Sequence, residues 1–255
     1  IVFGICFARS ERLALTLSEH VLCVLLGLSL FCLNYGFFYT ASLSLTTGLV
    51  SVVFSTMVFW NALGAWLILG QSLESRSLLG GAIGVLGLLI LFWSELLSFD
   101  WERDDSLALF LCLLGTLSAS SGNLVSATLQ KRGMTVWNST AFGMLYGTVL
   151  TFSFALFNDL DIQFEWTAVY IGSLLYLVIF GSVIAFGSYL TLIGRIGPSR
   201  AAYATVAFPV VAILVSVLFE GYQLTLLALV AVALVIVGNW LALSKPKVQK
   251  SPCRA

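Results

Sequence analysis

The residues of this sequence that could bind a small molecule lie inside long apolar stretches and are mostly uncharged. The polar and aromatic side chains at such depth are Asn34, Phe38, Trp60, Asn61, Thr116, Ser120, Asn123, Tyr146, Tyr189 and Tyr203. Thr116, Ser120 and Asn123 are four and three residues apart, which places them on one helix face. An amide or phenol without a partner in hydrocarbon is costly, so each should face protein or a wet cavity. We therefore expect this set to line a central cavity, with interhelical hydrogen bonding as the alternative for each member.

The ionisable residues exclude several kinds of chemistry. No Asp, Glu, Lys, Arg or His lies in the middle of an apolar stretch, which argues against a carboxylate proton relay and a basic clamp for phosphorylated molecules. His20 is the single histidine, and the sequence has no HExxH motif, no GxxxxGK loop and no CxxC pair. We therefore predict no metal site, no cofactor and no enzymatic activity. A neutral, zwitterionic or hydrophobic molecule, such as an amino acid or a drug-like compound, best fits apolar stretches whose middle parts carry no charge.

Two further residues could take part in a conformational change of the protein. Pro209 lies in the middle of an apolar stretch, where proline removes a backbone hydrogen bond and kinks a helix. This kink is either a gating hinge or a feature of packing. Glu220 ends the same stretch, where it is either a solvated helix cap or a residue that couples an ion or gates a pathway.

The composition indicates which elements must position these residues. Hydrophobic residues make up 60% of the 255 residues, charged residues make up 9%, and mean hydropathy is +1.03. Soluble domains carry about 25% charged residues, so the medium around this chain must be largely lipid. After an apolar stub at 1–8, stretches that approach the roughly 20 residues of a spanning helix lie at 21–40, 48–70, 78–94, 107–128, 139–157, 167–193, 201–219 and 223–243. The sequence therefore predicts an all-α, multi-pass membrane protein.

The basic residues predict how this bundle is oriented. When the connections are assigned alternately to two sides from 9–20 onward, one side holds every Lys and Arg except Arg103. The other side holds the acidic connections at 95–106 and 158–166. Basic connections remain in the cytoplasm, so the C-terminus is predicted to be cytoplasmic and the bacterial inner (plasma) membrane is the predicted location.

Two segments of the sequence align loosely and indicate an internal repeat. Residues 39–71 can be laid on residues 189–220, which places Gln71 on Glu220. The connection inside the first segment is uncharged and predicted to be external, whereas its counterpart is basic and predicted to be internal. Two copies of one unit with opposite orientation are what secondary transporters use for alternating access. The alternative is that two unrelated amphipathic hairpins align by chance.

The sequence resembles the EamA-type permeases of the drug/metabolite transporter superfamily. The motifs that carry the resemblance are Gly197-Pro198-Ser199, Ala207-Phe208-Pro209, Phe219-Glu220, Leu69-Gly70-Gln71 and the glycine-rich run 80–87. The chain departs from the family at Trp60, where Pro is expected, and at Gln71, where Glu is expected. The resemblance implies a polytopic bundle of ten helices in two inverted five-helix repeats, with the first helix and most of the second missing here.

The resemblance also implies a division of the chain and a function. Residues 1–94 form the incomplete first repeat, 95–106 an external acidic loop, 107–243 the second repeat, and 244–255 a basic cytoplasmic tail. The implied function is a secondary active transporter that exports or exchanges a small metabolite by alternating access. A membrane channel or scaffold and a membrane-embedded enzyme are the alternatives. The expected partners are the lipid bilayer and a small solute, without nucleic acid, and a homodimer is compatible with the sequence.

Overall fold

The computed structural model describes residues 1–97, 99, 103–160, 163–219 and 225–244. This part of the chain consists of helices and turns and contains no strand. The helices before residue 100 are α1 (Val2–Ala8), α2 (Leu17–Leu26), η1 (Gly27–Leu33), α3 (Asn34–Ala41), α4 (Thr47–Ser55), α5 (Met57–Leu69), α6 (Ser75–Leu91) and α7 (Trp93–Leu97). The later helices are α8 (Arg103–Lys131), α9 (Val136–Phe157), α10 (Ala168–Tyr176), η2 (Leu177–Ile184), α11 (Ala185–Ile196), α12 (Pro198–Ala201), α13 (Tyr203–Phe219) and α14 (Leu226–Leu243). The segments η1 and η2 are π-helical and continue the α-helices on either side of them.

In the described part of the chain, six continuous helical stretches are long and apolar enough to cross a bilayer. The stretches of 18 residues or more with this character are Leu17–Ala41, Thr47–Leu69, Asp105–Lys131, Val136–Phe157, Ala168–Ile196 and Leu226–Leu243. The helices α6 and α13 each have 17 residues. Every predicted stretch coincides with one of these helices, so the prediction of an all-α, multi-pass bundle is confirmed.

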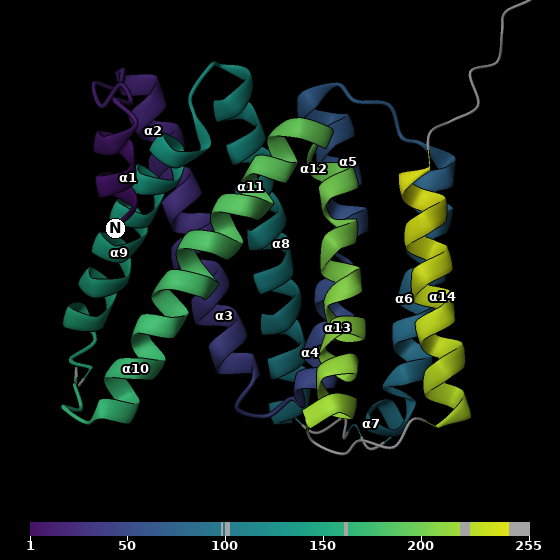
Figure 1. Ribbon diagram of the computed structural model, residues 1–255. Coiled ribbons are helices and arrows are strands. Elements are labelled where there is room, and N and C mark those ends of the chain that lie inside the picture. Colours follow the sequence, from purple (N-terminus) through teal and green to yellow (C-terminus); the bar gives the residue numbers. More distant parts are fainter. Residues whose placement is uncertain (98, 100–102, 161–162, 220–224, 245–255) are drawn as a thin grey trace, which may run out of the picture.

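The helices lie side by side across the bundle (Figure 1). The helices α1 and α2 pack against α9 at one flank, and α6 packs against α14 at the other. The long helix α8 runs between the flanks and contacts α2, η1, α3, α4, α5 and α11. The stretch from α10 to α11 crosses the bundle obliquely (Figure 1). The helix α8 touches helices from both halves of the chain and carries the buried polar residues Thr116, Ser120, Asn123 and Ser126.

Several connections that carry basic residues lie at one end of the bundle, which we call the basic end. The turn between α8 and α9, the short helix α12 and the start of α6 all lie there (Figure 1). Lys131 is the last residue of α8, Arg200 lies in α12, and Arg76 lies in the first turn of α6. The turn between α3 and α4 and the helix α7 lie at the opposite end (Figure 1).

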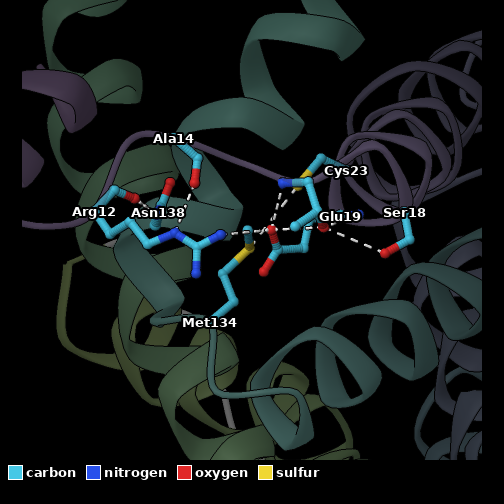
Figure 2. Close-up of polar contacts among 8 residues, drawn as sticks. Arg12, Ala14, Ser18, Glu19, Cys23, Met134 and Asn138 are labelled. Carbon is cyan, nitrogen blue, oxygen red and sulfur yellow. Dashed lines mark hydrogen bonds and ion pairs between the residues drawn. The ribbon is translucent and has the colours of Figure 1, made fainter.

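Polar contacts tie the connection between α1 and α2 to the start of α2 and to α9 (Figure 2). The Glu19 carboxylate accepts a hydrogen bond from the Thr16 N–H at 2.6 Å, and the Thr16 hydroxyl accepts one from the Glu19 N–H at 3.4 Å. This capping box satisfies two backbone donors at the start of α2. The same carboxylate lies 3.2 Å from the Arg12 guanidinium, and the Asn138 amide of α9 donates to the Arg12 carbonyl oxygen. These contacts hold the start of α2 against α9.

The helices α6 and α14 approach each other through glycine. A Cβ atom placed on Gly80 would lie 2.5 Å from the Gly238 carbonyl oxygen, and a Cβ on Gly238 would lie 2.5 Å from the Gly80 carbonyl oxygen. A Cβ on Gly87 would lie 2.8 Å from the Ala231 carbonyl oxygen. Small residues permit this backbone approach, which supplies van der Waals contact where lipid provides no hydrophobic driving force.

Two helical stretches share the same order of an α-helix, a π-helical segment and a second α-helix. The stretch α2–η1–α3 runs away from the basic end, and the stretch α10–η2–α11 runs toward it (Figure 1). Their π-helical segments begin at Gly27 and Leu177, which are 150 residues apart. Extended π-helical segments are rare in proteins, so their recurrence in two stretches of opposite direction is a specific likeness.

Candidate functional site

An apolar cavity of about 220 Å³ lies among helices from both halves of the chain, and we call it the central cavity. Its lining residues are Leu30, Asn34, Phe54, Met57, Ala119, Asn123, Ala185, Phe186, Tyr189, Thr205 and Phe208. They come from η1, α3, α4, α5, α8, α11 and α13. None of them is an acidic or basic residue. This lining suits a small solute that carries no net charge.

Asn123 is the buried polar centre of this cavity. Its side chain is 1% exposed, and its Nδ2 donates to the Tyr189 hydroxyl at 3.2 Å and lies 3.4 Å from the Met57 sulfur. Its Oδ1 atom is buried and has no hydrogen-bond partner. Asn34, also in the lining, donates to the Gly115 carbonyl oxygen at 3.4 Å. The structure therefore brings three of the predicted residues together in the central cavity, namely Asn34, Asn123 and Tyr189.

Asn61 of α5 lies next to this group. Its side chain is fully buried, its Nδ2 donates to the Pro198 carbonyl oxygen at 3.0 Å, and its Oδ1 has no partner. The Asn61 side chain also interacts with the Tyr189 hydroxyl. Asn61, Asn123 and Tyr189 come from three helices, so they form an amide–phenol cluster that joins both halves of the chain.

Other predicted residues surround the cavity without lining it. Thr116 and Ser120 are buried on the same helix as Asn123, and the Thr116 hydroxyl donates to the carbonyl oxygen one turn earlier. Phe38 packs edge-on against Phe54, which is a lining residue, with ring centroids 5.2 Å apart. The Thr116 hydroxyl is thus satisfied within its own helix, and not by the interhelical hydrogen bond that was the alternative for these residues.

Three more of the predicted residues lie away from the central cavity. The Tyr203 hydroxyl donates to the Ser77 carbonyl oxygen between α13 and α6. Trp60 lines a separate pocket beside α6. Tyr146 forms a 2.7 Å hydrogen bond with Nδ1 of His20, between α9 and α2. Sequence reasoning missed the His20–Tyr146 pair because 126 residues separate its members.

A second and larger cavity opens at the basic end, and we call it the basic-end vestibule. Its volume is about 930 Å³, and its acidic and basic lining residues are Glu74, Lys131, Arg195 and Arg200. The Arg200 guanidinium binds both oxygens of Glu74, at 2.7 and 3.0 Å. Neither Lys131 nor Arg195 has a carboxylate partner in the part of the chain that the structure describes. The vestibule is therefore polar and electropositive.

The amide–phenol cluster lies between the two cavities. Ala62 and Ala127 line the vestibule, and they lie one residue after Asn61 and one helical turn after Asn123. Pro198, whose carbonyl oxygen accepts the Asn61 bond, also lines the vestibule. The cluster thus lies beside residues that line the polar vestibule, while two of its members line the apolar central cavity. The vestibule was not predicted from sequence because its lining comes mostly from helix ends and connections.

Pro209 is buried inside α13, directly after the lining residue Phe208. Proline has no N–H to offer the carbonyl of Thr205 one turn earlier, and Thr205 also lines the central cavity. The proline therefore weakens the helix beside the cavity. Glu220, which was predicted to cap its helix, to couple an ion or to gate a pathway, lies outside the described residues. The basic tail from residue 245 onward lies outside them as well.

The two π-helical segments also border the central cavity. Leu30 lies inside η1, and Ala185 and Phe186 directly follow η2. A hydroxyl of α8, that of Ser118, donates to the Ser29 carbonyl oxygen inside η1 at 2.8 Å. Departures from α-helical hydrogen bonding of this kind occur frequently at functional sites.

Known proteins that are similar to this chain are membrane transporters. The chain is 25% identical over 243 residues to the Uncharacterized transporter YvbV of Bacillus subtilis (strain 168), which covers 94% of this chain and 76% of that protein. It is 22% identical over 226 residues to the Probable amino-acid metabolite efflux pump of Escherichia coli (strain K12), which covers 84% of this chain and 74% of that protein. A solved crystal structure shares the fold with a TM-score of 0.77 at 16% identity, covering 95% of this chain and 82% of that one.

The model of the EamA-like transporter family matches residues 106–244, which is more than half of the chain. The resemblance found in the sequence is therefore confirmed, and so is the prediction that the chain is not an enzyme. A transporter of this family sits in the lipid bilayer and handles small solutes. The chain is a multi-pass membrane transporter and belongs to the EamA-like transporter family.

Proposed function

We propose that this transporter exports or exchanges a small, neutral or zwitterionic solute of the amino-acid class by alternating access. The observation that carries the proposal is an uncharged central cavity, separated by the amide–phenol cluster from a wide polar vestibule. The vestibule would admit a solute from water, and the cavity would bind its apolar part. Opening of the cluster would join the two spaces.

The lining of the central cavity supports this solute class. Phe54, Phe186 and Phe208 offer aromatic surface, and Asn123 and Tyr189 offer hydrogen bonds. Such a mixture of apolar walls and few polar groups is typical of small-molecule sites. The name of the Escherichia coli relative, an amino-acid metabolite efflux pump, agrees with a solute that has both kinds of group.

Alternating access is supported by the recurring order of helices. We propose that residues 1–94 and 107–243 are two inverted repeats, because α2–η1–α3 and α10–η2–α11 share their internal order and run in opposite directions. Inverted repeats rock or gate around a site at their interface. The central cavity takes residues from both repeats, as this mechanism requires.

Export is supported by the orientation that the basic residues favour. We place the basic end in the cytoplasm of a bacterial cell, because basic connections are retained on that side of the inner membrane. The basic-end vestibule then faces the cytoplasm, where an exporter loads its solute.

The proposal is tested with the purified chain in proteoliposomes. We expect saturable counterflow, in which unlabelled phenylalanine or leucine inside the vesicles drives the uptake of the labelled amino acid. A sugar phosphate serves as a negative control, because the cavity lacks a basic residue to bind it. Flux that rises linearly with concentration, without counterflow, would indicate the channel alternative and contradict the proposal.

A further inference from the structure

Two amide oxygens in this protein are buried without a hydrogen-bond partner at the cluster between the cavities. They are Oδ1 of Asn61 and Oδ1 of Asn123, and both side chains are at most 1% exposed. Buried polar atoms nearly always have partners in native proteins, so each exception calls for an explanation. In a site that binds a solute, such an atom is explained when the solute supplies the partner.

The hydrogen bonds of Asn123 indicate which partner is missing. Its Nδ2 is engaged by the Tyr189 hydroxyl, and Nδ2 is the donor end of the amide. The remaining Oδ1 can only accept hydrogen bonds, so it requires a donor. Asn123 lines the central cavity, from which a bound molecule could provide that donor. Asn61 differs, since it does not line this cavity.

The surroundings of Asn123 favour a primary amine or ammonium group as the donor. An ammonium group has three N–H donors and needs acceptors, which Asn123 Oδ1 and the Tyr189 hydroxyl oxygen can supply. Aromatic side chains in the lining, such as Phe54 and Phe186, attract cations to their faces. No basic residue lines the cavity to repel a cation.

We infer that Asn123, positioned by Tyr189, is the specificity-determining residue that accepts the hydrogen bond of the solute's amino group. The inference rests on the proposed function and restricts its solutes to zwitterionic amino acids that also have an apolar part. An uncharged solute of the same shape without an amine leaves Oδ1 unpaired, and an analogue with only a carboxylate offers it no donor. Both are therefore discriminated against.

The test measures binding to the purified protein in detergent, using three related compounds. L-phenylalanine has both charged groups, phenethylamine lacks the carboxylate, and 3-phenylpropanoate lacks the amine. We expect the wild-type protein to bind the first two at least about 10-fold more tightly than 3-phenylpropanoate, which corresponds to one lost hydrogen bond to a charged group. Equal affinities for phenylalanine and 3-phenylpropanoate would overturn the inference.

Variants at one position separate recognition from folding. Asn123→Leu keeps the side-chain size but removes the acceptor, and we expect it to bind phenylalanine and 3-phenylpropanoate within about 2-fold of each other. Asn123→Asp keeps an acceptor oxygen, and we expect it to retain the preference for amines even if the Leu variant does not fold. Thr128→Val is a matched control on α8. The Thr128 hydroxyl donates to the Leu124 carbonyl oxygen of the same helix at 2.8 Å, its one hydrogen bond among the described residues, and Thr128 lines neither cavity.

The outcomes distinguish this inference from the proposed function. Loss of amine preference in Asn123→Leu, with the preference kept in Asn123→Asp and Thr128→Val, supports the inference. An unchanged preference in Asn123→Leu, or a lost preference in Asn123→Asp, overturns it, while wild-type counterflow of phenylalanine leaves the proposed function standing. Absence of both binding and counterflow in the wild-type protein overturns the proposed function and this inference with it.

Discussion

Replacement of Gly80 by alanine tests how tightly α6 and α14 are packed. The added Cβ atom would lie 2.5 Å from the Gly238 carbonyl oxygen and 2.8 Å from the Cβ atom of Ala242. Real Cβ atoms essentially never approach other atoms below 3.0 Å, and the nearest atom here belongs to the backbone of the neighbouring helix. The two helices must therefore move apart along their shared face.

The size of the effect follows from two opposing contributions. Overpacking of a well-packed interface costs about 1–3 kcal/mol, and a rigid backbone neighbour favours the upper part of this range. The higher helix propensity of alanine over glycine returns about 1 kcal/mol. We therefore expect Gly80→Ala to lower the free energy of unfolding by about 1–2 kcal/mol, which lowers the unfolding temperature by about 2–8 °C.

Thermal unfolding of the purified variant in detergent, followed by size-exclusion chromatography of the remaining folded protein, measures this change. Gly36→Ala is the matched control, because Gly36 lies inside α3 and a Cβ placed there has nothing within 4 Å. The control gains helix propensity without a clash, so its unfolding temperature should rise or stay the same. A Gly80→Ala variant as stable as the Gly36→Ala variant would refute the close packing of α6 and α14.

Three further predictions concern other contacts between helices. Glu74→Gln should destabilise the protein by up to about 1 kcal/mol, because it weakens the half-exposed ion pair with Arg200. A double-mutant cycle with Arg200→Gln measures the coupling between the two residues, and zero coupling would mean that the pair contributes nothing to stability. Tyr203→Phe should lower the free energy of unfolding by about 1 kcal/mol, since the buried Ser77 carbonyl oxygen loses its side-chain donor, and an unchanged unfolding temperature would contradict this. Pro209→Ala should slow counterflow with little change in the yield of folded protein; a large loss of folded protein would instead identify the proline as a packing feature.

Much of the fold could be predicted because a bilayer imposes a simple rule on the sequence. Backbone groups in hydrocarbon must bond within their own helix, so each span appears as a continuous apolar run of about 20 residues. The run predicted at 21–40 became Leu17–Ala41, and the run predicted at 139–157 became Val136–Phe157. The ends moved by a few residues because capping residues such as Thr16 and Thr135 extend a helix into its polar flank.

The candidate site was predicted only in part. The spacing of Thr116, Ser120 and Asn123 correctly placed buried polar residues on one face of α8. The same spacing did not indicate that Asn123 meets Tyr189 in the cavity while Thr116 bonds within its own helix. Tyr146 is equally deep in its apolar run, but it bonds to His20 of α2 and lies away from the central cavity.

The sequence by itself thus determined the membrane-spanning helices and favoured one orientation, while the tertiary structure decided which polar residues share a cavity. A hydrophobic run indicates that a helix crosses the bilayer, and helical periodicity indicates which residues lie on one face of that helix. Neither feature indicates which neighbouring helix that face contacts. Asn123 and Tyr189, 66 residues apart, meet only because α8 and α11 pack against each other. In lipid, van der Waals fit and hydrogen bonds between helices decide that packing, because burial of apolar surface gives no preference among neighbours.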